Sequence, residues 1–65
     1  MSPLYTIELR KSRRLLRQRY YWVLIHRNGN VLATSEMYAN KGDRDAVAHA
    51  LHAHMKDGDS EISAE

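Results

Sequence analysis

The feature that most constrains the fold is a run of six large aromatic and branched residues, Tyr20–Ile25. Residues of these types fit the pleated, half-buried surface of a β-strand. Successive side chains of a strand point to opposite faces. One face of this strand carries Tyr20, Trp22 and Leu24, and the other carries Tyr21, Val23 and Ile25. Both faces are therefore apolar, which is unusual for a strand in a small sheet.

Two further strands are predicted beside this one. Residues 4–10 alternate apolar and polar side chains, which is the period of a strand with one buried face. The pair Asn28-Gly29 supplies the backbone conformation of a tight hairpin turn, and Val31–Ser35 returns as the third strand. The polar and basic residues 11–18 connect the first two strands and could extend them into a projecting hairpin arm.

A helix is predicted to begin near Lys41, with Asn40 accepting a hydrogen bond from the backbone N–H of Asp43. Apolar residues then recur at spacings of three and four, as in a helix with one face on a sheet. This stripe consists of Ala46, Val47, Ala50, Leu51, His54 and Met55, and Gly58 is expected to end the helical segment. Residues 57–65 are acidic and poor in apolar groups, and we expect a disordered tail there.

These elements predict an α+β fold: a three-stranded antiparallel sheet followed by one helix (βββα), within a domain of residues 1–56. One helix covers only one face of the sheet, so the opposite face of the central strand would be left in water. A chain of 65 residues buries little surface, and without cysteine it cannot add a disulfide. We therefore expect a homodimer. The predicted interface is Tyr21, Val23, Ile25, His54 and Met55; alternatively, Arg and Lys side chains of the same chain fold over this face.

The order of motifs also resembles a known family. The motifs are Arg19-Tyr20-Tyr21-Trp22-Val23-Leu24, then Asn28-Gly29, then Thr34-Ser35-Glu36-Met37-Tyr38 followed by Lys41. Over about residues 5–55 this order is similar to that of the YegP-like family of small bacterial proteins of unknown function. The resemblance implies a βββα unit that occurs as a tandem repeat or, in single copy, as a homodimer with a shared sheet. Family members differ in having polar or basic residues at Tyr21 and Val23 and a short turn in place of the basic stretch.

The strongest electrostatic feature is a basic arm at residues 10–19. Its six bases are Arg10, Lys11, Arg13, Arg14, Arg17 and Arg19. The sequence predicts a non-enzymatic interaction module in which this arm and the apolar sheet face recognise a protein partner. The alternative is DNA or RNA binding, since Arg and Lys neutralise phosphates and a two-stranded ribbon fits a major groove. The acidic tail could also cover the arm.

No catalytic residues are expected, because Ser35 and Glu36 are neighbours in a strand and point to opposite faces. Asp45, His49 and His52 could present a carboxylate and two imidazoles to a metal ion, but such a site also needs ligands from elsewhere. A solvated polar face opposite the apolar stripe explains the same residues, and we predict no metal site and no cofactor. No apolar run is long enough to span a bilayer and the N-terminus does not resemble a leader. We expect a cytoplasmic protein without membrane contact.

Overall fold

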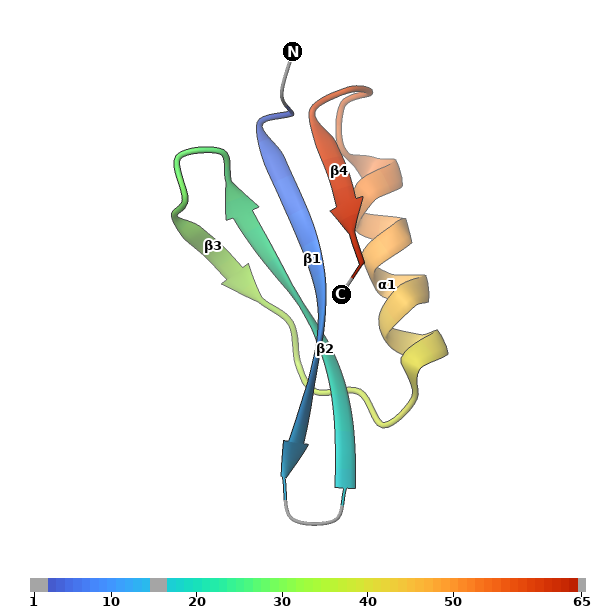
Figure 1. The fold of residues 1–65 in the computed structure, drawn as a ribbon. Helices are drawn as coiled ribbons and strands as arrows, with labels where there is room; N and C mark the ends of the chain where they lie inside the picture. The colour runs from blue at the N-terminus through green and yellow to red at the C-terminus, as the bar shows by residue number, and fades with distance from the viewer. Residues whose placement is uncertain (1–2, 15–16, 65) are drawn as a thin grey trace.

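The computed structural model describes residues 3–14 and 17–64, which form one mixed sheet and one helix (Figure 1). The elements are β1 (Tyr5–Arg14), β2 (Arg17–His26), β3 (Val31–Thr34), α1 (Lys41–His54) and β4 (Ser60–Ser63). The strand order is β3-β2-β1-β4. The β1–β2 and β2–β3 pairs are antiparallel, whereas β4 runs parallel to β1. The predicted α+β class is confirmed, with a four-stranded mixed sheet in place of three antiparallel strands.

The hairpin between β2 and β3 forms as predicted. Gly29 has a φ of +95°, and its N–H donates to the carbonyl of His26 at 2.8 Å. The side-chain oxygen of Asn28 accepts the N–H of Asn30 at 2.9 Å. Gly29 thus supplies the positive φ on which the prediction rested, and the side chain of Asn28 adds a hydrogen bond to the backbone of the turn.

The hydrophobic core lies between the sheet and α1. Ile7, Leu9 and Ala48 are its buried centre, and four half-buried residues pack against them: Trp22, Leu24, Leu51 and Ile62. The register pairs Ile7 with Leu24 and Leu9 with Trp22, so these four side chains share the face that meets the helix. The prediction that Trp22 and Leu24 face the core is thus confirmed.

The helix packs with a different face from the one predicted. Its buried residues are Arg44 and Ala48, while Val47 is 40% exposed and Ala46, Ala50 and His54 are exposed. The helix is therefore turned by about one residue, roughly 100°, relative to the predicted stripe. Leu51 packs against the core as predicted and Met55 is half-buried. The prediction is wrong for Ala46, Val47, Ala50 and His54, because the first turn meets the sheet through Arg44, which an apolar pattern does not include.

The start of α1 and the acidic tail also differ from expectation. Asn40 precedes the helix as predicted, but its side chain makes no capping bond to the backbone; its amide donates to Asp43 Oδ2 at 3.4 Å. The disordered tail predicted for 57–65 is wrong for Ser60–Ser63, which form β4 along β1. Tyr5 N–H donates to the Asp59 carbonyl at 2.9 Å and begins this pairing.

Candidate interaction surfaces

The basic arm is a two-stranded ribbon that projects from the body. The ladder between β1 and β2 continues to the pair Arg14–Arg17, and this end of the hairpin extends beyond the start of α1 (Figure 1). It contributes to an elongated molecule, with extents of 41 × 22 × 17 Å. The predicted projecting arm is confirmed. The side chain of Arg14 and residues 15 and 16 lie outside the described part of the chain.

The register sorts the arm's side chains onto two faces. Side chains that alternate with Ile7 and Leu9 point away from α1, and we call this side of the sheet the open face. On the open face Arg10 pairs with Tyr21 and Ser12 with Arg19, and Arg17 follows toward the tip. Lys11 and Arg13 belong to the opposite face, where they pair with Tyr20 and Gln18. Lys11, Arg13 and Arg17 are exposed.

The open face changes from basic to apolar along β2. Arg17 and Arg19 come first, and Tyr21, Val23 and Ile25 follow on the same face. On the neighbouring strand β3, Val31 pairs with Ile25 and is 58% exposed. In the described part of the chain the only helix packs on the other side of the sheet. The open face thus offers a cationic half and an apolar half without a covering element.

Val23 departs from the sequence prediction, because it is only 3% exposed within a single chain. It lies between Glu8 on β1 and Thr34 on β3, and Arg10 Nε donates to Glu8 Oε1 at 2.7 Å beside it. The expectation that a lone unit leaves Val23 in water is therefore wrong. This arrangement fits the alternative in which basic side chains of the same chain cover part of this face. Tyr21 and Ile25 are half-buried and remain accessible.

The Arg10–Glu8 pair also marks the border between the two halves of the open face. The hydrogen bond to Glu8 raises the pKa of Arg10 above its ordinary value, and Tyr21 adds to this shift. Arg10 therefore keeps its charge while one part of it is already occupied by a carboxylate. In the described part of the chain, the cations of this face nearer the tip are Arg17, which is exposed, and Arg19, which is half-buried.

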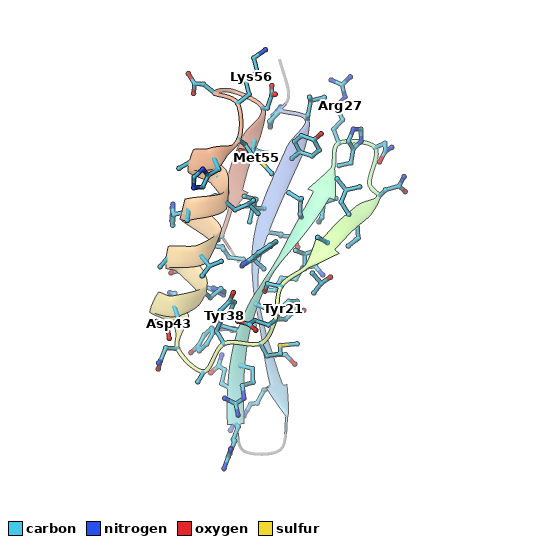
Figure 2. The ribbon with its side chains drawn as sticks, turned by 180° about the vertical axis from the view of Figure 1, so that it is seen from behind. Tyr21, Arg27, Tyr38, Asp43, Met55 and Lys56 are labelled. Carbon is cyan, nitrogen blue, oxygen red and sulfur yellow. The ribbon has the colours of Figure 1, made fainter. Side chains whose placement is uncertain are left out.

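The five residues of the predicted interface do not form one surface. Tyr21, Val23 and Ile25 belong to the open face, whereas His54 and Met55 lie at the end of α1 on the opposite side of the sheet. Figure 2 shows Met55 at the far end of the helix from Tyr21, which lies near the level of Asp43 at the helix start. One partner subunit lying flat on the open face could not contact both groups.

A second accessible surface is the edge of β3. This strand has a neighbour on one side only, and within it Val31 and Leu32 are 58% and 52% exposed. Residues 28–35 contain no charged side chain. Charged residues normally protect such an edge against pairing with another strand. The other edge strand, β4, has that protection through Glu61 and the nearby Asp57 and Asp59.

Two polar contacts were missed by sequence reasoning. Arg44 is buried at 1% exposure and contacts the base of the arm. His52 Nδ1 lies 2.7 Å from Ser60 Oγ and ties the end of α1 to β4. A serine beside a histidine can act as a nucleophile with its base, but this serine is buried between helix and sheet, so we assign the pair a structural role. The contact between His52 and Ser60 could have been predicted only if residues 60–63 had been recognised as a strand.

The three helix residues considered as metal ligands do not come together as a binding site. Asp45 accepts from Arg44 Nε at 2.9 Å, His52 contacts Ser60, and His49 is exposed. The described residues contain no group of three or more such side chains that could hold a metal ion. Nor does any described helix combine the length and apolarity needed to cross a membrane.

The acidic segment does not cover the arm in the described part of the chain. The turn with Asp57 and Asp59 lies next to the start of β1, at the opposite end of the molecule from the arm (Figure 1). Glu61 lies beside Thr6, whose hydroxyl donates to it at 3.5 Å. The bases of the arm therefore lie at one end of the molecule, and the opposite end carries both signs of charge, since Lys56 and Arg27 lie there with Asp57 and Asp59 (Figure 2).

Comparison with known proteins identifies the family. A model described as a domain of unknown function, DUF1508, matches residues 17–61. The match includes β2, β3, α1 and the first two residues of β4, and leaves β1 with its four arm bases outside. Neither curated proteins nor solved structures yield a match. Because the matched segment is more than half of the sequence, the chain belongs to the DUF1508 family of domains of unknown function.

Proposed function

We propose that the chain is a non-enzymatic interaction module that recognises an acidic protein segment with its open face. The observation that supports this is the register of β2, which places Arg17 and Arg19 in line with the accessible apolar residues Tyr21 and Ile25 on one face. A partner strand or helix with a carboxylate-rich half and an apolar half would match this order. Charge would then steer and orient the partner, and the apolar half would supply burial.

The experiment compares two double variants with the same change of charge. Arg17→Glu with Arg19→Glu reverses the charge on the open face. Lys11→Glu with Arg13→Glu reverses the charge on the other face of the same ribbon. The probe is a fluorescent 14-residue peptide with a glutamate-rich half and a leucine-rich half, and binding is measured by anisotropy. We expect the open-face variant to lose affinity by at least about tenfold, or about 1.4 kcal/mol, and the control to lose much less.

Equal losses in the two variants would contradict the proposal, because recognition would then depend on net charge and not on one face. Absence of peptide binding by the unmodified chain would contradict it as well.

A second candidate, binding of nucleic acid, is favoured by a specific observation. No acidic residue occurs between Leu9 and Ser35, and cations occupy both faces of the ribbon. A ribbon inserted into a major groove would use both faces. For a 16-base-pair DNA duplex we then expect both double variants to lose affinity similarly. Affinity should also fall steeply between about 50 and 200 mM salt.

Self-association is the other part of the proposal. The burial of Val23 within one chain leaves less of the predicted interface for a second copy, so we place the contact at the edge of β3. Two β3 strands pairing antiparallel about a two-fold axis would extend the sheet, and such an interface is self-complementary. Antiparallel pairing would also point the two basic arms in opposite directions and limit their repulsion. The resemblance to the YegP-like family implies a homodimer for a single-copy unit and is consistent with the DUF1508 match. Membership of the YegP-like family is itself a proposal.

Light scattering tests this contact. Leu32→Lys places a charge at the exposed edge, and Val47→Lys makes a comparable change on the exposed side of α1. From about 10 to 200 µM we expect the unmodified chain and Val47→Lys to be dimers and Leu32→Lys to be a monomer with unchanged circular dichroism. A monomeric unmodified chain, or a dimer that survives Leu32→Lys, would remove the β3 contact from the proposal.

A further inference from the structure

The most unusual side chain in the described part of the molecule is a buried arginine. Arg44 is 1% exposed and, with Ile7, is among the largest fully buried side chains. Arginine is almost never buried to this extent unless its charge and donors have partners. Because an apolar residue of similar volume usually packs there at lower cost, its contacts indicate what the arginine is for.

The contacts of Arg44 converge on the base of the basic arm. Its Nη1 donates to the backbone carbonyl of Arg10 at 2.7 Å, and its guanidinium carbon lies 5.2 Å from the ring centroid of Tyr20. The Nε of Arg44 donates to Asp45 Oδ1 at 2.9 Å, and this hydrogen bond fixes the plane of the guanidinium group. One side chain of the helix therefore holds β1 and β2 at neighbouring rungs of the ladder.

A second contact holds the same place from the loop before α1. Tyr20 and Tyr38 exchange two backbone hydrogen bonds, at 2.9 and 2.7 Å. Figure 2 shows Tyr38 between the helix start near Asp43 and the strands. From these rungs toward the tip, the arm continues into the exposed residues Lys11, Arg13, Arg17 and Gln18.

We propose that Arg44 is a positioning residue that fixes the direction in which the basic arm leaves the body. Its planar guanidinium engages a backbone carbonyl and an aromatic face at once. A thioether can do neither as a cation, and an ammonium can make such contacts only without the planar geometry that fixes both directions. An arm held in one direction presents Arg17 and Arg19 without a further loss of conformational freedom on binding. The effect on binding rests on the proposed function, whereas the effect on arm direction does not.

The direction of the arm can be measured directly, since the chain contains no cysteine to compete with introduced labels. Spin labels at Gln18→Cys on the arm and Ala53→Cys on α1, diluted with unlabelled chain, give the distance distribution between them. We expect a narrow distribution for the parent, a clearly broader one for Arg44→Met, and an intermediate one for Arg44→Lys. Lys41→Met, which removes an exposed cation from the same helix, should leave the distribution unchanged.

The binding readout uses the acidic peptide probe. Arg44→Met should weaken its binding about three- to tenfold although every base of the arm is retained, and Arg44→Lys should recover part of the loss. An unchanged distance distribution in Arg44→Met overturns the inference, even where Arg17→Glu with Arg19→Glu abolishes binding. A broadened distribution in a chain that never binds the peptide supports positioning and contradicts the proposed function.

Arg44→Met could also fail to fold, which circular dichroism would reveal. The comparison then uses Arg44→Lys together with Tyr20→Leu, which removes the ring under the guanidinium and keeps Arg44. Both should broaden the distribution. A narrow distribution in both variants overturns the inference.

Discussion

At the scale of single residues, polar side chains set the geometry that the apolar pattern leaves open. Ser35 illustrates this: its hydroxyl accepts the backbone N–H of Trp22 at 2.8 Å and donates to the carbonyl of Glu36 at 2.9 Å. It thereby continues the β2–β3 contact past the last residue of β3, where Ser35 N–H also donates to the Trp22 carbonyl at 2.9 Å. Ser35 is thus a structural link between β2 and the segment that follows β3.

Ser35→Ala should lower the free energy of unfolding by about 1–2 kcal/mol, because a half-buried backbone N–H loses its acceptor. Urea denaturation measures the change. Ser63→Ala, at an exposed position, is the control and should stay within about 0.5 kcal/mol. Equal stability of the two variants would show that water replaces the hydroxyl without cost.

Residue-scale patterns also explain which parts of the site could be predicted. The alternation in β2 correctly assigned Trp22 and Leu24 to the core, because side-chain direction in a strand follows from sequence spacing alone. It could not reveal that Val23 is covered, since this depends on Glu8, Thr34 and the ion pair of Arg10, which come from other segments. Arg44 was passed over because a buried arginine is recognised only from its partners.

At the scale of elements, a helix, strand or turn could be predicted where its own residues have a pattern typical of that structure. The hairpin turn, the two long strands and the start of α1 all have such a pattern. Strand β4 has none: Ser60–Ser63 contains one apolar residue, and the segment becomes a strand because β1 offers a free edge. Strand formation depends on neighbours more than helix formation does, and here the neighbour is some 55 residues away in sequence.

Two glycine substitutions separate backbone conformation from packing. A Cβ at Gly29 or at Gly42 would meet no atom within 4 Å, but Gly29 has a φ of +95° and Gly42 lies in the first turn of α1. Gly29→Ala should therefore destabilise the chain by about 1–2 kcal/mol, and Gly42→Ala should stabilise it by up to about 1 kcal/mol. Thermal unfolding followed at 222 nm distinguishes the signs. Destabilisation by both would indicate that the helix start needs glycine for another reason.

At the scale of the whole molecule, the bases of the arm gather at one end of the long axis, and the two edges of the sheet differ in protection. The basic arm lies at one end and the turn with Asp57 and Asp59 at the other. The β3 edge is uncharged, while the β4 edge carries Glu61. Composition gave the number of these charges, but only the path of the chain shows that Asp57, Asp59 and Glu61 lie away from the arm.

A chain ending at Asp59 tests the role of β4. It should lose the contact of Ile62 with the core and uncover the edge of β1, so we expect lower thermal stability and large assemblies at about 100 µM in light scattering. Full-length Ile62→Ala keeps the strand and loses most of its apolar contact; we expect lower stability without large assemblies. A shortened chain that scatters like the full-length one would contradict this role.

The short parallel strand at the end of the described chain has a consequence for how many copies can join. A subunit whose sheet has two unprotected outer strands can add another subunit on each side and so form a continuous fibre. Where a charged strand such as β4 protects one side, only the other side can accept a second subunit, and assembly then stops at two copies. Four residues, Ser60–Ser63, would thus set an upper limit on edge-to-edge growth.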